Sequence, residues 1–478
     1  MTDITIAWIA LPLFAGFNIY LFAKLGRYLA LLGALGSVAY AVTLLVQPEP
    51  IALQFLDSFG VQLVADTLSG YFILTNALVT IAVILYCWDS DKSAFFFAQT
   101  IILHGSVNAV FICADLISLY VALEVIGIAA FLLIAYPRSD RAIWVALRYL
   151  FVSNTAMVFY LIGVVLVYQA NQSFGFAGLV NAPAEAIALI FLGLLTKGGV
   201  FVSGLWLPMT HSEADTPVSA LLSGTVVKTG VFPLVRFALE FETLQPLLAL
   251  FGVGTALLGV GFAIFERDTK RTLALSTISQ LGFVLVAPTT AGVYALTHGL
   301  AKATLFLSAG NLPSRRFEEL RQTKMPMMLW SAVAIAGLSI SGLPLLGGFG
   351  AKALTLDRIV PWQANVLTVA AVGTAIVFAK FLFLPTSADA DGKPLSRGYG
   401  WAVLPLLAGL IAVNGLSLEA YTVAKVAKAL VTVGGGWVAY WLFCRQRSLR
   451  VPQRLERLEH LIGGMSLVLT LVFWMVLT

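Results

Sequence analysis

The chain has 478 residues, of which 59% are hydrophobic and 11% are charged, with a net charge of +5 and a mean hydropathy of +0.92. Soluble domains carry roughly 25% charged residues, so this composition excludes a soluble protein and predicts a polytopic membrane protein. The three cysteines form no CxxC pair, and no phosphate-binding loop or haem-type His pattern occurs. We therefore expect no cofactor, no metal and no direct use of ATP.

Hydropathy divides the chain into about sixteen apolar segments, each long enough to cross a bilayer or nearly so. The last two are the weakest. We expect an all-α polytopic membrane protein with about 14–16 transmembrane helices. The segments are residues 8–23, 28–46, 67–87, 95–113, 116–136, 143–168, 184–207, 217–239, 246–265, 272–287, 292–311, 326–360, 365–384, 401–418, 429–443 and 461–477.

Loops rich in lysine and arginine alternate with loops that lack them. Basic loops face the cytoplasm, or the stroma of a thylakoid, so the alternation predicts the orientation and places the N-terminus on the other side. We expect a bacterial plasma membrane or a thylakoid membrane. The basic loops are 24–27, 137–141, 267–271, 315–324, 393–397 and 445–457, and the alternate loops are 47–66, 169–181, 240–245 and 288–291.

Five charged residues stand inside these apolar segments: Glu124, Lys197, Lys228, Lys302 and Lys352. A charge near the middle of a bilayer costs at least ~2.5–3.5 kcal/mol, which packing alone does not explain. The five residues therefore predict a polar path for ions or protons. Glu124 lies about eight residues into its segment, and we interpret it as a charge that modulates a nearby lysine.

The lysines suggest an order along this path. Lys197 stands near the middle of its segment beside two glycines, and an amine removed from water can bind and release a proton there. Lys228 is the expected relay from Lys197. His298 and Lys302 are four residues apart, so they share one face of a helix and suit a central shuttle. Lys352 follows a glycine-rich run and is the expected terminal donor or acceptor.

Polar residues at the segment ends allow plainer readings. His211, Glu213 and Asp215 lie in a stretch rich in turn residues, which we interpret either as an inlet funnel or, equally, as a solvated loop. Arg236 and Lys380 stand near segment ends, where long side chains reach the membrane surface. The charged residues 445–459 are expected to lie along that surface.

A glycine-interrupted segment occurs in each half of the chain, at residues 191–200 and again at 347–352. Such pairs are typical of transporters built from inverted repeats. We therefore expect four regions: N-terminal helices at 1–90, a first repeat at 91–240, a second repeat at 241–385, and C-terminal helices with an extension at 386–478.

Several strings together resemble the antiporter-like subunits shared by respiratory complex I and the multisubunit cation/proton (Mrp-type) antiporters. The resemblance implies two inverted five-helix repeats, each with a broken helix, and a Glu-Lys-Lys-His/Lys-Lys axis along the membrane midplane. It places Glu124, Lys197, Lys228, His298, Lys302 and Lys352 on that axis. The matching strings are residues 119–124, 195–197, 206–208, 216–231, 268–282 and 297–310, together with Gly342-Leu-Pro, Gly348-Phe and Lys352.

At position 352 this chain has lysine, which resembles the D-type subunit of the Mrp antiporters. The complex I subunit more often has glutamate at this position. The resemblance implies a proton- and cation-translocating subunit of a Na⁺/H⁺ antiporter, with other membrane subunits, lipids, protons and Na⁺ as partners and no nucleic acid. An alternative is a proton-pumping subunit of an NADH- or ferredoxin-linked quinone oxidoreductase. A third class, a membrane-embedded lipid transferase, lacks support because no loop carries a carboxylate pair aimed at the membrane. No catalytic chemistry is visible in this chain alone.

Overall fold

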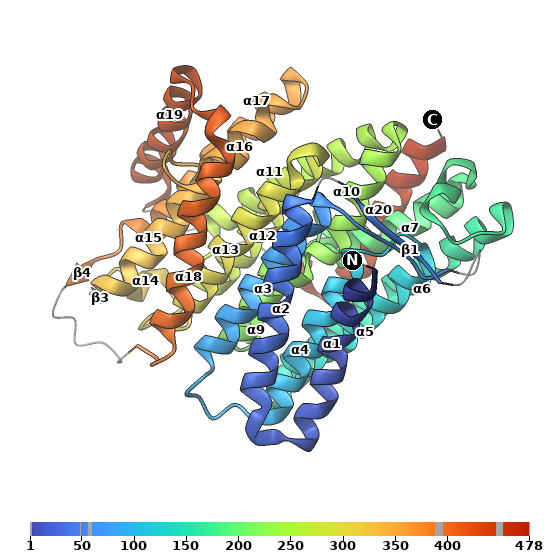
Figure 1. Ribbon diagram of the computed structural model, residues 1–478. Helices are drawn as coiled ribbons and strands as arrows, with labels where there is room; N and C mark the ends of the chain where they lie inside the picture. The colour runs from blue at the N-terminus through green and yellow to red at the C-terminus, as the bar shows by residue number, and fades with distance from the viewer. Residues whose placement is uncertain (1, 48, 56–59, 388–394, 446–452, 478) are drawn as a thin grey trace.

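The computed structural model describes residues 2–47, 49–55, 60–387, 395–445 and 453–477. Within these residues the chain is a bundle of long helices with two small two-stranded sheets (Figure 1). Twelve helices of the described residues are long and apolar enough to span a membrane; Thr269–Val286 and Pro288–Ala309 form a further pair bent by 110°, and two shorter apolar helices accompany them. The expected all-α polytopic fold is confirmed, and each of the sixteen apolar segments overlaps a helix or a helix pair.

The first two helices pack side by side at one edge of the bundle, and the third lies between them and the later helices (Figure 1). Between the second and third helices, a hairpin pairs Ile51 with Ala65. Asp66 then caps the third helix by accepting the backbone N–H of Ser69, and its carboxylate lies 2.5 Å from the guanidinium of Arg236. Arg236 was expected to extend to the membrane surface, but it is paired inside the protein. The elements are α1 (Thr2–Leu21), α2 (Gly26–Val46), β1 (Ile51–Gln54), β2 (Gln62–Ala65) and α3 (Thr67–Tyr86).

The next seven helices contain the first glycine-interrupted segment. They are α4 (Ala94–Val110), α5 (Leu116–Ile134), α6 (Asp140–Asn171), α7 (Ala184–Lys197), α8 (Leu207–Glu213), α9 (Thr216–Leu221) and α10 (Lys228–Glu240). The break after α7 needs glycine, because Gly199 has φ +68°, a left-handed conformation that other residues adopt at a cost. A π-helical turn, Leu222–Val226, interrupts the path from α9 to α10.

The second group of elements contains the second interruption. It comprises α11 (Gln245–Phe265), α12 (Thr269–Val286), α13 (Ala291–Ala309), α14 (Phe317–Leu320), β3 (Met325–Pro326), α15 (Met327–Ser341), α16 (Gly347–Asp357), α17 (Pro361–Leu382) and β4 (Thr386–Ser387). Strands β3 and β4 pair in parallel. The helix break between α15 and α16 begins at Gly342, whose φ is +87°. The first expected break, within residues 191–200, is therefore present in the structure, whereas the second lies at 342–346, just before the expected segment 347–352, which is helical.

The last helices separate to opposite sides of the molecule (Figure 1). They are α18 (Tyr399–Ala412), α19 (Val423–Ala439) and α20 (Leu458–Leu477). Helix α19 packs on α17, whereas α20 packs on α7, next to the first helix break. Helix α20 thus contacts the first glycine-interrupted segment, whereas the turn Val413–Ala420 after α18 contacts the second, on α16.

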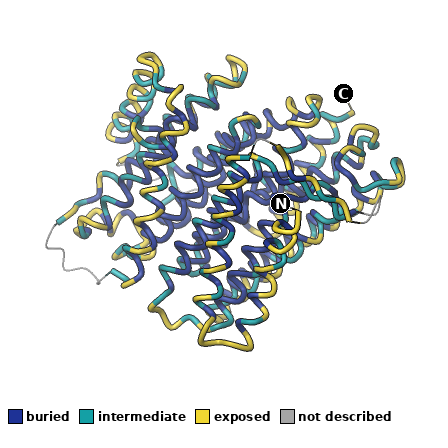
Figure 2. The backbone as a smooth tube through the Cα atoms, viewed as in Figure 1, coloured by how far each residue is buried: buried dark blue, intermediate teal, exposed yellow. Residues whose placement is uncertain are grey.

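Buried residues run through the middle of the bundle, while α19 and the ends of the outer helices are largely exposed (Figure 2). The middle is apolar, but it also contains buried polar groups that have partners. His104 on α4, for example, contacts Ser37 at 2.8 Å, Thr80 at 3.1 Å and Asn108 at 3.1 Å. A buried polar group usually has such partners, which makes those that lack them informative.

Candidate functional site along the buried lysines

Lys197 is the last residue of α7, and the helix is interrupted immediately after it. Its side chain is buried, and its ammonium group donates a hydrogen bond of 2.6 Å to the hydroxyl of Ser153 on α6. The amine lies beside Gly127 of α5, where an added Cβ would stand 3.1 Å from Nζ. The negative end of the helix dipole favours a positive charge at this position.

Glu124 stands three residues before Gly127 on α5, so its side chain lies on the same face of the helix as the Lys197 amine. It is partly exposed, and its buried Oε1 atom has no hydrogen-bond partner among the described residues. The carboxylate and the Lys197 ammonium are near enough to interact electrostatically, but they do not form an ion pair in the described part of the chain. The structure therefore shows this pair in a separated arrangement.

Lys228 is fully buried at the start of α10, directly after the π-helical turn. Its amine donates to the carbonyl of Gly224 at 2.6 Å and to that of Ser223 at 3.4 Å. A π turn shifts the helical hydrogen bonds and frees carbonyls of this kind, and such turns are frequent at functional sites. The amine faces α13, because a Cβ on Gly299 would lie 3.5 Å from it.

His298 stands one residue before Gly299 on α13 and Lys302 three residues after it, and the Lys228 amine is close enough to both to interact electrostatically. Lys302 is fully buried and donates to the carbonyl of Leu273 at 2.8 Å and to the hydroxyl of Ser276, both on α12. His298 is also buried, and neither ring nitrogen has a partner among the described residues. A buried imidazole whose two nitrogens make no hydrogen bond can accept and donate a proton without first losing a hydrogen bond.

A small cavity of about 10 Å³ joins His298 to Lys352. This volume is enough for about one water molecule, and Gln280 and Tyr294 supply polar atoms around it. Lys352 lies on α16, one turn after the second helix break, with its amine 5.2 Å from the centre of the Phe283 ring. Its Nζ atom has no hydrogen-bond partner within the described chain.

The four lysines thus stand on four neighbouring helices, and three of them adjoin an interruption: Lys197 precedes a break, Lys228 follows the π turn, and Lys352 follows the second break. Hydroxyls, a histidine and a small polar cavity lie between or beside the amines. All of these groups can bind or release protons or hold water. The arrangement suits stepwise proton movement along the middle of the bundle.

The proposed inlet residues do not form one group. His211 was expected in a loop, but it lies on helix α8, fully buried, and stacks on the Phe306 ring at 4.6 Å between centroids. The region is packed under neighbouring helices, which a turn-rich sequence does not reveal. Glu213 pairs with Arg141 at 3.0 Å, and Asp215 pairs with Lys92 at 2.5 Å. These two carboxylates are therefore engaged in ion pairs at the ends of short helices.

A wider hollow of about 480 Å³ lies close to these residues, on the side of the basic loops. Thr216, Lys270, Gly310 and Arg315 line it, together with neighbouring loop residues, whereas His211, Glu213 and Asp215 are not part of its wall. Lys270 donates to the carbonyl of Ala214 at 2.9 Å, which fixes its amine at the inner side of the hollow.

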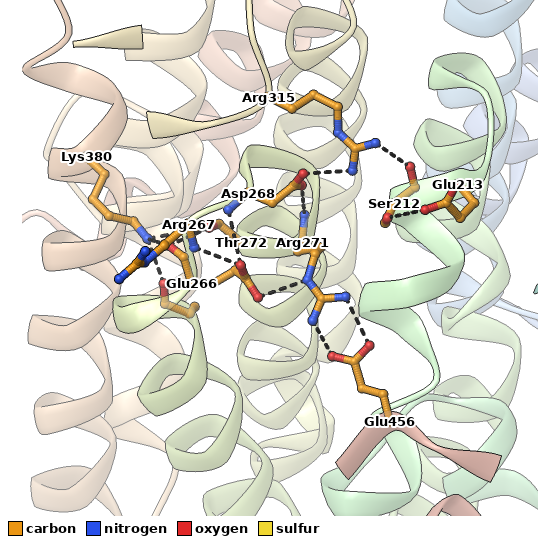
Figure 3. A network of polar contacts seen from close by, with 11 residues as sticks. Ser212, Glu213, Glu266, Arg267, Asp268, Arg271, Thr272, Arg315, Lys380 and Glu456 are labelled. Carbon is orange, nitrogen blue, oxygen red and sulfur yellow. Dashed lines mark hydrogen bonds and ion pairs between the residues drawn. The ribbon is translucent and has the colours of Figure 1, made fainter. Parts of the chain in front are cut away.

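A polar network that the sequence did not predict joins distant parts of the chain (Figure 3). Arg271, at the start of α12, lies between two carboxylates, Glu266 at 2.9 Å and Glu456 from the C-terminal segment. Arg148 on α6 donates to the backbone carbonyl of Glu456. Burial alone would raise the pKa of the Glu266 carboxyl, but Arg271 and two backbone N–H groups hold that pKa below its usual value. Glu266 is therefore ionised at neutral pH.

Two expectations for charged residues are corrected by this region (Figure 3). Lys380 does not reach the membrane surface: it is buried and donates to the carbonyls of Ala263 and Glu266, each at 2.8 Å, at the end of α11. Unpaired carbonyls at a helix end attract such a donor. Glu456, expected on the membrane surface, is buried against Arg271. The preceding residues, 446–452, lie outside the described chain.

Comparison with known proteins is consistent with this geometry. The sequence profile of the family described as "NADH:quinone oxidoreductase/Mrp antiporter, TM" matches residues 113–378. The N subunit of an NADH-quinone oxidoreductase from Desulforudis audaxviator is 32% identical over 67% of this chain and 71% of that protein. The D-type component of a Na(+)/H(+) antiporter from Alkalihalophilus pseudofirmus is 27% identical over 79% of this chain and 85% of that protein.

Two solved structures share the fold. A chain of the archaeal membrane-bound sulfane sulfur reductase superposes with a TM-score of 0.77 and 23% identity, covering 91% of this chain and 99% of the other. A chain of the Mrp complex from Dietzia sp. superposes with a TM-score of 0.74 and 21% identity, covering 97% of this chain and 100% of the other. The similarity therefore extends beyond the profile match and includes the C-terminal helices.

Proposed function

Because the chain belongs to the transmembrane family shared by NADH:quinone oxidoreductases and Mrp antiporters, we propose that it is the D-type, proton-translocating subunit of a multisubunit Na⁺/H⁺ antiporter. The chain is an integral membrane protein, and its relatives are subunits of larger assemblies, so other membrane subunits are its partners. We further propose that protons move along an axis formed by Glu124, Lys197, Lys228, His298, Lys302 and Lys352.

One observation carries this proposal: four buried amines lie on adjoining helices, and three of them adjoin an interrupted helix. Burying an ammonium group costs several kcal/mol, and apolar residues of similar volume would stabilise the bundle at least as well. Packing therefore gives no reason for four such residues in one row. Repeated binding and release of protons does give a reason.

The proposed mechanism is electrostatic. Two unit charges 4 Å apart at an effective dielectric of about 20 interact by about 4 kcal/mol, which changes a proton affinity roughly a thousandfold. When the Lys197 ammonium approaches Glu124 its charge is stabilised, and when it turns to Ser153 that stabilisation is lost. The separated arrangement seen here favours transfer of the positive charge toward Lys228. Between Lys228 and Lys302 the interaction is repulsive, and the two amines are close enough for a charge on one to disfavour a charge on the other.

The first test is Lys197→Ala. We expect cation/proton antiport in membrane vesicles to fall to background. The change removes the amine that would bind and release protons at the first helix break. Assembly should persist, since Ser153 loses a single partner. Antiport is measured as dequenching of a pH-sensitive dye after cation addition, and assembly by co-purification of the companion subunits. Wild-type antiport with an intact complex would refute the role of Lys197.

A second candidate function is a proton-pumping subunit of a quinone oxidoreductase, and a specific observation favours it. The relative with 32% identity is the N subunit of an NADH-quinone oxidoreductase. In that case the amines would form the same proton path, but electron transfer in other subunits of the complex would supply the energy. The composition of the purified complex separates the two functions, because flavin and iron–sulfur subunits accompany only the second.

A further inference from the structure

Besides the small cavity that it shares with His298, Lys352 lines another pocket, of about 70 Å³. Helix α15 starts at the loops of the basic side and α17 returns to them, so the outer end of α16 lies on the opposite face of the membrane. The pocket is bounded by Lys352 and Asp357 on α16, Thr368 on α17, and Lys425 and Lys428 on α19. Its volume accommodates several water molecules.

The inner end of this pocket is defined by an amine without a partner. The Lys352 side chain is 7% exposed, and its Nζ atom makes no hydrogen bond to any described residue. Gly342 packs against its stem, where an added Cβ would stand 3.1 Å from Cδ. The second helix break thus fixes the side chain of Lys352, with its amine between this pocket and the small cavity that reaches His298.

The mouth of the pocket has an excess of positive charge. Lys425 pairs with Asp357 at 2.5 Å. Lys428 lies three residues further along α19 and therefore on the same side of the helix. It has no ion-pair partner in the described part of the chain. Two ammonium groups thus face one carboxylate, and both belong to α19, which lies outside the residues matched by the family profile.

We propose that Lys425 and Lys428 form a cationic collar that admits water and protons to Lys352 from this face but excludes alkali-metal cations. A charged cleft with walls of low dielectric raises the local concentration of ions of opposite sign by 10- to 1,000-fold and lowers that of like sign. The collar repels a free hydrated proton as strongly as it repels Na⁺. A proton can still cross, because an ammonium group of the collar can release its proton inward and the amine can then bind another from outside, so no added cation enters the cleft. Na⁺ has no such route. The proposal rests on the proposed function, since it treats Lys352 as the outer proton carrier.

The test is charge-selective labelling of a cysteine in the pocket, in the assembled complex, with the face opposite the basic loops turned outward. Cys87, Cys113 and Cys444 are replaced by alanine, and Ala353→Cys is introduced beside Lys352. The labelling rates with an anionic methanethiosulfonate (ethylsulfonate) and a cationic one (ethyltrimethylammonium) are compared. Ala170→Cys, at the exposed end of α6 on the same face, is the reference.

We expect the anionic-to-cationic rate ratio at Ala353→Cys to exceed that at the reference by about 10-fold. The pair of changes Lys425→Gln and Lys428→Gln should bring the ratio to the reference value, whereas Asp357→Asn should raise it further. If Ala353→Cys does not assemble, Ala429→Cys on the α19 wall replaces it.

A ratio equal to the reference, a ratio that the double change leaves unaltered, or no labelling by either reagent would overturn the proposal. Labelling requires no transport, so this result is independent of the Lys197→Ala experiment. A charge-selective pocket in a chain whose Lys197→Ala variant retains antiport would refute the proposed function alone. Antiport that depends on Lys197, combined with an unselective pocket, would refute the collar alone.

Discussion

Replacing Lys228 with methionine is expected to lower proton-coupled transport by about 100-fold or more, while the complex still assembles. Lys228 is the amine between the first helix break and the pair on α13, and a Cβ added at Gly299 would lie 3.5 Å from its Nζ atom. Methionine has a similar length and suits the buried site, so packing changes little. The loss would therefore report the missing titratable group rather than an unfolded bundle.

Lys228→Arg separates a proton carrier from a fixed charge. Arginine keeps the positive charge but does not release its proton, because a guanidinium stays protonated in proteins. We expect the arginine variant to be as inactive as the methionine variant when antiport is measured per assembled complex in vesicles. If Lys228→Arg transports at the wild-type rate, Lys228 supplies only a static charge, and the relay from α10 to α13 is refuted.

Glu456→Gln is expected to lower the free energy of unfolding by about 3 kcal/mol. The Glu456 carboxylate is buried and accepts two N–H groups of Arg271, so its loss leaves a buried guanidinium with Glu266 as the remaining carboxylate. Glutamine preserves the shape but not the charge. The segment before α20 should then dock less firmly against α6 and α12.

The measurement is thermal unfolding of the purified complex in detergent, with Glu459→Gln as the matched control. Glu459 lies three residues later, is 68% exposed and pairs with Arg457 at 3.7 Å. Exposed pairs contribute at most about 1 kcal/mol, so this control should unfold close to the wild-type temperature. Equal melting temperatures for both variants would show that Glu456 and Arg271 are not coupled in the folded protein.

Local sequence was enough to predict the first helix break, but it placed the second at residues 347–352, just after its actual position at 342–346. Gly199 and Gly342 supply left-handed conformations that few other residues adopt, and each stands close to a buried lysine. The buried lysines could also be picked out from local sequence. A charge within an apolar segment is costly whatever the helix packs against, so its presence alone indicates a functional role. The site residues and the inverted repeat stay predictions, since neither the fold nor the relatives test them.

Features that depend on distant packing were missed. The π turn before Lys228 contains no residue that marks it in the sequence. The Glu456 and Arg271 side chains meet across 185 positions, which no local pattern indicates. His211 and Lys380 were misplaced for the same reason: their burial depends on neighbouring helices and on carbonyls at the end of another helix, not on the residues beside them.

The most direct measurement is proton flux itself, in liposomes that contain the purified complex and a trapped pH indicator. Lys197, Lys228, Lys302 and Lys352 are changed to methionine one at a time, and Lys380→Met serves as a buried lysine that is held by carbonyls at the end of α11. The account predicts background flux for each of the four and near wild-type flux per folded complex for Lys380→Met. Wild-type flux in any of the four variants would contradict a path that runs through the buried amines.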